Sequence, residues 1–257
     1  MLLTKIRLNT NRFLRNMPIV GNSNSTQQHL LFEIEEPFND YYNKGLRISN
    51  TPDRGVKRRA RFYNLVQLLK SVNDIDGLVV ECGCWKGLSS YLMSQYMRDI
   101  SAAFNGADFY ILDSFEGLSD PNEQDKITAK LVDVVGNRQN TFFKKAGAYD
   151  ASLEHVKNVL IEFPHIQYHK GWLPQSLDTL VIPKAIKFLH IDLDLYEPIL
   201  GTLQKLYPHV ASGGIVVCDD YGSLFWPGAK KAVEEFAQMA GVKFIALSSG
   251  QAIFIKN

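Results

Sequence analysis

Short apolar runs alternate along the chain with longer stretches in which apolar residues recur every three or four positions. Runs of this kind, bounded by glycine or polar residues, are typical of strands buried on both faces of a parallel sheet. The stretches with the longer period predict amphipathic helices. The expected strands are 78–82, 108–113, 166–169, 186–192 and 214–219. The expected helices are 56–72, 87–104, 150–163, 198–210 and 228–239, with Asp150 as the cap of the third.

The end of the chain predicts a hairpin of two strands, 243–247 and 252–256. Alternating strands and helices that finish in a hairpin predict an α/β fold, with a doubly wound, Rossmann-like sheet of seven strands that is mostly parallel. Gly213 and Gly214 are expected to form the turn before the fifth strand. Residues 1–55 are polar and irregular, so we expect an N-terminal extension and candidate lid ahead of one domain at 56–257.

Four acidic residues end the fourth and fifth expected strands. Asp192 and Asp194 end the fourth, and Asp219 and Asp220 end the fifth. Parallel strands joined by a helix bring their carboxyl ends to one edge of the sheet, where ligands of open α/β folds bind. Carboxylates at that spacing repel one another, so either some hold protons or a cation lies among them. Oxygen ligands suit Mg²⁺, and the alternative is a set of acids that only caps the sheet edge.

Glycines and an acid also follow the first two strands. Gly83 and Gly87 would let backbone N–H groups approach a ligand, and Asp113 can accept hydrogen bonds from both hydroxyls of a ribose. The dinucleotide pattern G-x-G-x-x-G is broken by Trp85, which disfavours NAD. An adenosyl ligand without phosphates fits this arrangement better.

Composition narrows the function further. The net charge of +1 argues against nucleic acid as a partner. Cys82, Cys84 and Cys218 fall on or just after expected strands, which suits buried thiols and a cytoplasmic location better than a disulfide framework. No apolar run is long enough to predict a transmembrane segment, and a homodimer is a reasonable expectation for this fold.

Five stretches, taken in chain order, carry a family resemblance. They are ECGCWKG at 81–87, DSFEG at 113–117, GWLP at 171–174, HIDLD at 190–194 and DDY at 219–221. Together they resemble the macrocin O-methyltransferase family, and the resemblance runs from about Arg61 to the C-terminus. It implies the class I methyltransferase fold, S-adenosyl-L-methionine and Mg²⁺ as cofactors, and a hydroxyl of a sugar or sugar-bearing natural product as the methyl acceptor.

The resemblance also implies roles for individual residues. The expected metal ligands are Asp192, Asp219 and Asp220, and Asp194 competes with Asp192 because alternate residues of a strand share a face. The expected cofactor contacts are Glu81, Cys82, Gly83, Asp113, Ser114, Gly171, Trp172 and Asp192.

An aliphatic hydroxyl scarcely ionises at neutral pH, so its methylation calls for a cation that lowers its pKa and a carboxylate that takes its proton. Asp192 is expected to serve as both metal ligand and general base. His190 is the alternative base, although its place within a strand favours a packed histidine. Trp172 is expected either to stack on the adenine or to belong to the core.

Other residues near the expected cleft have two readings. Tyr221 and Trp226 would line the acceptor pocket or simply pack. The basic run at 58–61 is expected to be a solvated helix start, with Arg61 and Tyr63 facing the cleft as the alternative.

Three rival functions compete with sugar methylation. A catechol-type O-methyltransferase would use the same cofactor and metal. A metal-dependent hydrolase could use the same Asp cluster, but it would leave Glu81 and Asp113 without a role. A non-catalytic nucleotide-binding module would leave the strand-end acids unexplained. The choice of acceptor is expected to depend on the loop at 114–149 and on the N-terminal segment.

Overall fold

Seven strands form one sheet in the order β3-β2-β1-β4-β5-β7-β6. β1 to β5 pair in parallel, whereas β7 runs antiparallel to its neighbours β5 and β6. The strands are β1 (Leu78–Cys82), β2 (Phe109–Asp113), β3 (Gln167–Lys170), β4 (Ile186–Ile191), β5 (Val210–Cys218), β6 (Ile245–Ala246) and β7 (Ala252–Ile255). This topology confirms the predicted doubly wound, mostly parallel sheet with a C-terminal hairpin.

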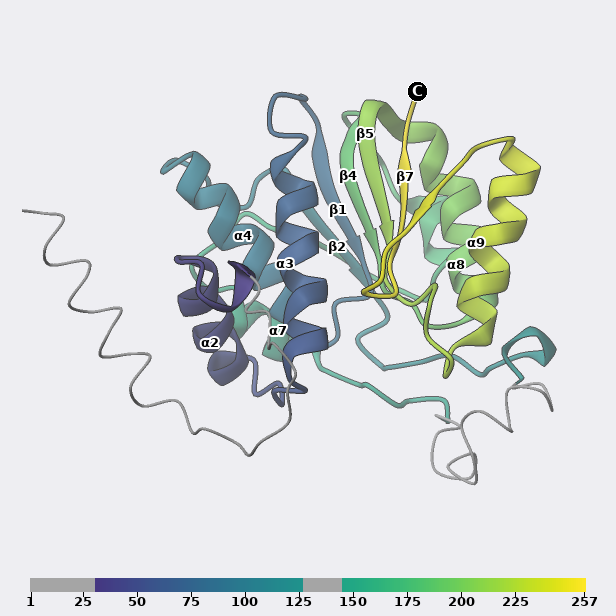
Figure 1. Cartoon of the computed structure of the whole chain (residues 1–257), viewed down its shortest axis with the longest axis horizontal. Helices are drawn as coiled ribbons and strands as arrows, with labels where there is room; N and C mark the ends of the chain where they lie inside the picture. Colours follow the sequence, from purple (N-terminus) through teal and green to yellow (C-terminus); the bar gives the residue numbers. More distant parts are fainter. Residues whose placement is uncertain (1–30, 127–144) are drawn as a thin grey trace, which may run out of the picture. The chain divides into compact units, whose positions relative to one another are not determined.

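The structure is a computed structural model that describes residues 31–126 and 145–257, of which Phe32–Asn257 form one unit. Helices cover both faces of the sheet (Figure 1). On one face lie α2 (Phe38–Ile48), α3 (Val56–Lys70), α4 (Leu88–Ile100) and α7 (Leu153–Val159), and on the other α8 (Tyr196–Leu206) and α9 (Pro227–Ala240). Single 3₁₀ turns are η1 (Leu31–Glu33), η2 (Glu123–Asp125), η4 (Gln175–Thr179) and η5 (Tyr207–His209).

The two faces of the sheet carry two separate hydrophobic cores. Successive residues of a strand point to opposite faces, so Val79 packs with α2, α3, α4 and α7, whereas Leu78 and Val80 pack with α8 and α9. All five residues of β1 are buried as a result. This double burial explains why the parallel strands read as continuous apolar runs in the sequence.

The segment before α3 is more ordered than its composition indicates. Phe38 and Tyr42 lie on α2 and are buried in the core shared with α3 and α4. The expectation of an irregular segment is therefore wrong for 38–48, because two aromatic side chains anchor an otherwise polar helix. The domain boundary at residue 55 stays a prediction, and residues 1–30 lie outside the described part of the chain.

Two local predictions are also wrong. Gly213 and Gly214 lie inside β5, which begins at Val210 and has an irregular register there, and the positive φ of 77° at Gly213 accommodates the extra residues. The preceding helix ends at Leu206, ahead of Pro208, which explains the early start of the strand. In α7 the cap is Ser152, whose hydroxyl oxygen accepts a hydrogen bond from the His155 N–H at 3.1 Å, so the helix starts later than expected.

The three cysteines are free and buried, as predicted. Within residues 31–126 and 145–257, no helix combines the length and apolar character needed to cross a membrane.

The turn after β1 approaches the end of β4 so closely that only glycine fits. A Cβ atom on Gly83 would lie 2.0 Å from the carbonyl oxygen of Asp192, and its φ of 82° already disfavours other residues. Gly83→Ala is expected to lower the free energy of unfolding by roughly 3 kcal/mol, because steric overlap adds to backbone strain. Urea denaturation followed by circular dichroism measures the change.

Gly241→Ala is the matched control. Gly241 also has a positive φ, 65°, but no atom lies within 4 Å of its would-be Cβ. The free energy of unfolding should fall by only about 1 kcal/mol in Gly241→Ala, which is the cost of the backbone conformation alone. Equal losses for the two variants would contradict the close approach.

Candidate active site

A cavity of about 540 Å³ opens at the carboxyl ends of the parallel strands. Its wall includes residues that directly follow, or end, four neighbouring strands: Gly83 after β1, Asp113 on β2, Asp192 after β4, and Asp219 and Asp220 after β5. This edge is where ligands bind in open α/β sheets, and the predicted convergence of the strand-end acids is therefore present.

Asp113 fixes the loops that follow β1 and β2. One oxygen of its carboxylate accepts the N–H of Cys84 at 2.7 Å, and the other accepts the N–H of Phe115 at 2.7 Å. Its carbonyl oxygen accepts the N–H of Gly171 at 2.9 Å. Each carboxylate oxygen keeps a further lone pair, so Asp113 can still accept hydrogen bonds from a ligand in the cavity.

Backbone strain gathers around this cavity. Trp85, Tyr149 and Asp194 line it and have positive φ angles of 45°, 63° and 60°, and Phe115 in the loop after β2 has 56°. Non-glycine residues adopt such angles rarely, and they cluster where a site has to hold a particular geometry. The loops around the cavity are therefore held in conformations that local preference alone would not select.

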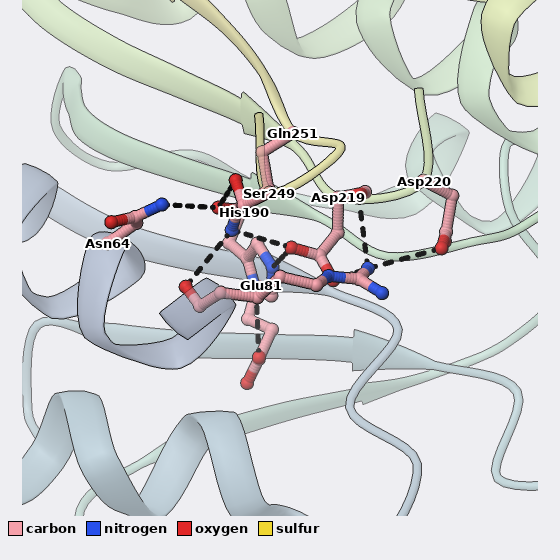
Figure 2. Close-up of polar contacts among 8 residues, drawn as sticks. Asn64, Glu81, His190, Asp219, Asp220, Ser249 and Gln251 are labelled. Carbon is pink, nitrogen blue, oxygen red and sulfur yellow. Dashed lines mark hydrogen bonds and ion pairs between the residues drawn. The ribbon is translucent and has the colours of Figure 1, made fainter. Parts of the chain in front are cut away.

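Glu81 lies beneath the cavity and does not line it. Its side chain is fully buried, accepts a hydrogen bond from the Ser90 hydroxyl, and pairs with Nδ1 of His190 at 3.0 Å. On the other side of the ring, Nε2 of His190 lies 3.8 Å from the Asp219 carboxylate (Figure 2). His190 is thus buried and paired, which confirms the prediction of a packed histidine rather than an exposed general base.

Arg61 reaches this cluster from α3. Its guanidinium forms ion pairs with the carboxylates of Asp219 and Asp220, and it donates to the Asp219 carbonyl oxygen at 3.0 Å. Gln251 completes the surroundings by donating to the Asp219 carboxylate at 2.8 Å (Figure 2). The expectation of a solvated helix start is wrong for Arg61. Tyr63 does not face the cavity, because its hydroxyl donates to Glu35.

These contacts shift the pKa values of the paired groups. Burial alone would raise the pKa of Asp219, but Arg61 and His190 outweigh it and hold that pKa well below its ordinary range. Burial alone would lower the pKa of His190, but the carboxylates of Asp219 and Glu81 raise it to about 10. At neutral pH the carboxylate of Asp219 is therefore held between two cations, Arg61 and His190.

A second group of acids is only partly balanced by positive charge: Asp220 pairs with Arg61, but among the described residues neither Asp192 nor Asp194 has an ion pair. Oxygens of Asp192, Asp194 and Asp220 lie within 4.8 Å of one another, as do ligand atoms of His190, Asp192 and Asp219. Burial and the mutual repulsion of these acids raise the pKa values of Asp192 and Asp194 well above the ordinary range. Carboxylates in this state gain most from a cation.

The donor set fits Mg²⁺. The atoms that Asp192, Asp194 and Asp220 offer are all carboxylate oxygens. Among the described residues, Oδ2 of Asp220 is buried and has no hydrogen-bond partner. The geometry groups Asp194, the predicted competitor, with Asp192 and Asp220, while Asp219 is already engaged by Arg61 and Gln251.

The predicted cofactor contacts divide into two sets. The members that line the cavity are Gly83, Asp113, Ser114, Trp172 and Asp192. Three others do not line it: Glu81, Cys82 and Gly171. Glu81 and Cys82 are fully buried in the sheet, so their position offers no support for direct contact with a ligand.

Aromatic residues form another part of the wall. Trp172 lines the cavity and is 40% exposed, which excludes the alternative that it belongs to the hydrophobic core. Trp226 also lines it, whereas Tyr221 packs on Phe244 instead. Tyr149 lies between Trp85 and Trp226, with ring centroids 5.3 and 6.5 Å away. No sequence pattern predicts this place for Tyr149, since nothing in its local sequence indicates that the residue lines the cavity.

The strand order and the position of the cavity define a class I S-adenosylmethionine-dependent methyltransferase fold. The chain belongs to the Macrocin-O-methyltransferase (TylF) family, whose profile matches residues 50–246. The family resemblance seen in the five sequence motifs is thereby confirmed.

Relatives of known function and solved structure agree with this assignment. Demethyldecarbamoylnovobiocin O-methyltransferase from Streptomyces niveus is 30% identical over 190 residues, which cover 71% of this chain and 66% of that protein. Mycinamicin III 3''-O-methyltransferase from Micromonospora griseorubida is 24% identical over 71% of this chain and 69% of its own length. The chain thus spans about two thirds of the length of these relatives.

Two solved structures share the fold. The O-methyltransferase NovP superposes with a TM-score of 0.61 at 27% identity, covering 79% of this chain and 81% of that one. The calicheamicin methyltransferase CalS11 superposes with a TM-score of 0.58 at 18% identity, covering 91% and 99% of the two chains, which is a likeness of fold alone.

Arg61→Met tests the ion pairs in the cavity wall. Removing the guanidinium leaves the largely buried Asp220 without a counterion and Asp219 with His190 alone, so the free energy of unfolding should fall by about 3 kcal/mol at pH 7. The folded state holds the pKa of Asp219 below its unfolded value, so the pairing contributes above that value and is lost as the pH falls. The loss should therefore start to shrink only below about pH 4 and be clearly smaller at about pH 3 than at pH 7, measured by urea denaturation at both.

Lys184→Met is the control for this prediction. Lys184 pairs with Asp108 at 3.1 Å, but both side chains are nearly half exposed. A surface pair of this kind is expected to contribute less than about 1 kcal/mol. A loss for Arg61→Met no larger than that of Lys184→Met would show that Arg61 is not a required counterion.

Proposed function

We propose that this protein transfers the methyl group of S-adenosyl-L-methionine to a hydroxyl of a sugar or sugar-bearing natural product, with Mg²⁺ as a second cofactor. The observation that carries the proposal is the presence in one cavity of Asp113 and the clustered acids Asp192, Asp194 and Asp220. Membership of the family and the sugar-bearing substrates named for its relatives support it.

In this proposal the cofactor lies across the ends of β1 and β2. Asp113 accepts the ribose hydroxyls, while Ser114 and Gly83 shape the wall around the nucleoside. Trp172 is exposed in the cavity and offers an aromatic face to the adenine. Glu81 does not contact the cofactor in this proposal, because it is hydrogen-bonded to His190 and does not line the cavity.

Asp192 is the proposed general base. Its carboxylate lines the cavity and belongs to both groups of clustered acids. Burial, followed by repulsion from Asp220 and Asp219, raises its pKa and favours the protonated form, and a protonated carboxyl cannot take the proton of the acceptor. Mg²⁺, when bound, would restore the carboxylate and lower the pKa of the acceptor hydroxyl.

The proposed metal ligands are Asp192, Asp220 and one further carboxylate. The family resemblance implies Asp219 for the third place, and the cluster geometry favours Asp194. If Asp219 keeps its ion pair with Arg61, it positions the site from behind rather than binding the metal.

Transfer from a sulfonium is an in-line displacement, so the acceptor oxygen must face the methyl carbon opposite the sulfur. Holding both reactants in one cavity supplies much of the rate gain. A catechol-type acceptor stays the second candidate, because its two oxygens also suit a cation. The family assignment leaves the metal-dependent hydrolase without support. The cytoplasmic location and the homodimer stay predictions.

Asp113→Asn tests the cofactor site. The substitution keeps the size of the side chain but replaces one acceptor oxygen by a donor, so affinity for S-adenosylhomocysteine should fall about 10- to 100-fold. Isothermal titration calorimetry measures the dissociation constant. Asp108→Asn, at the opposite end of the same strand, should bind like the wild type. Absence of binding to the wild-type protein would refute the methyltransferase assignment.

Asp192→Asn tests the chemical step. The variant should bind S-adenosylhomocysteine with little change and lose methyl transfer by at least about 100-fold, because the amide cannot take a proton. Methyl transfer is measured from labelled S-adenosylmethionine against a panel of sugar-bearing natural products and catechols, with and without Mg²⁺. Manganese binding followed by electron paramagnetic resonance gives a readout of the metal site independent of turnover.

Asp194→Asn provides the comparison. If Asp192 is the base, Asp194→Asn weakens manganese binding but keeps more turnover at saturating metal than Asp192→Asn does. Retained turnover in Asp192→Asn, or a metal-independent rate in the wild type, would overturn this part of the proposal.

A further inference from the structure

Three arginines lie within four positions near the start of α3, and they differ in their partners. Arg59 pairs with Asp53 at 3.6 Å, and Arg61 pairs with Asp219 and Asp220. Within residues 31–126 and 145–257, Arg58 has no carboxylate partner. Its guanidinium donates to the Pro52 carbonyl oxygen at 3.1 Å, which engages one of its five N–H groups.

Arg58 lies in the wall of the cavity, against aromatic rings. Its guanidinium carbon is 5.5 Å from the ring centroid of Trp85 and 5.5 Å from that of Phe62. Arg54 and Lys86 lie 5.7 and 5.4 Å from the same indole. Three cations therefore surround one ring, and their mutual repulsion favours an anion among them.

The electrostatic surroundings of Arg58 are unfavourable for an unpaired cation. Burial, followed by the charge of Arg54, lowers the pKa of Arg58 below its ordinary value. The first turn of α3 contains no acid, although the helix macrodipole favours negative charge there. A bound anion would relieve both effects, so this wall of the cavity is suited to a carboxylate.

The position of Arg58 selects the source of that carboxylate. The proposed ribose ligand Asp113 is bonded to the Cys84 N–H, which places the nucleoside on one side of the turn that follows β1. In the proposed pose the amino-acid part would extend from the sulfur past this turn, towards Trp85, which lines the same cavity as Arg58. Asp192, Asp194 and Asp220 repel a carboxylate, which leaves the basic wall as its complement.

We infer that Arg58 binds the α-carboxylate of S-adenosylmethionine and of S-adenosylhomocysteine, an assignment that rests on the proposed methyltransferase function. A planar guanidinium can donate two parallel hydrogen bonds to a carboxylate, which a lysine cannot do. Arg54 adds positive charge at the exposed edge of the same site. An anionic group on the methyl acceptor is the other possible source and is separated by the test below.

The test compares two probes that differ only in the carboxylate: S-adenosylhomocysteine and its decarboxylated analogue. Calorimetric titration of the wild type should show about 10- to 100-fold tighter binding of S-adenosylhomocysteine, the range for charge-assisted hydrogen bonds. In Arg58→Gln the two dissociation constants should agree within about threefold, through weaker binding of S-adenosylhomocysteine alone. Arg58→Lys should keep part of the preference.

Lys70→Gln is the charge control, because Lys70 is exposed at the far end of the same helix. It should keep the full preference for the carboxylate. Because the readout is a ratio, a general loss of structure in Arg58→Gln would weaken both probes and leave the ratio unchanged.

An unchanged ratio in an Arg58→Gln protein that binds the decarboxylated analogue as tightly as the wild type does overturns the inference. If the KM for the acceptor rises instead, the anion belongs to the acceptor. Failure of the wild type to bind either probe refutes the methyltransferase function itself, which distinguishes the two failures.

Discussion

Buried carboxylates at one edge of a parallel sheet are the constraint on which the rest of this structure depends. The topology brings the ends of β4 and β5 together, so Asp192, Asp219 and Asp220 meet whether or not their charges are balanced. His190 on β4 supplies part of the balancing positive charge, next to Asp219. Arg61 supplies the rest from α3, and the start of that helix is thereby tied to the cavity wall. Fold and site depend on the same ion pairs.

The charge network continues from Arg61 into the sheet. Glu81 and His190 are register partners on β1 and β4, and Asp219 lies across from them after β5, so all three project to the face covered by α3 and α4. Each buried charge has an opposite neighbour, which offsets the cost of taking it out of water. Asp219 is therefore positioned by side chains from two strands, from α3 and, through Gln251, from the turn before β7, rather than by its own loop.

The sequence predicted the strands better than the contacts of the site. Continuous apolar runs mark strands covered on both faces, and these runs located β1 to β4 to within about a residue. The start of β5 was missed because Gly213 and Gly214 are ordinary turn residues, and α2 was missed because two buried aromatics outweigh a polar composition. Arg61 and Glu81 could not be assigned from local pattern, since each finds its partners more than a hundred residues away or across the sheet.

Negative and positive side chains lie on different sides of the cavity, so the cavity favours one orientation of a charged ligand. Acids after β4 and β5 form one side, and Arg54 and Arg58 with the indole of Trp85 form another. S-adenosylmethionine carries a positive sulfonium, and its amino-acid end carries an α-ammonium and a negative α-carboxylate. The favoured orientation turns the carboxylate to the arginines and the sulfonium to the acids. In the favoured orientation the sulfonium, and with it the methyl group, faces the acids. The charges that order the cofactor would then also place its reactive carbon beside Asp192.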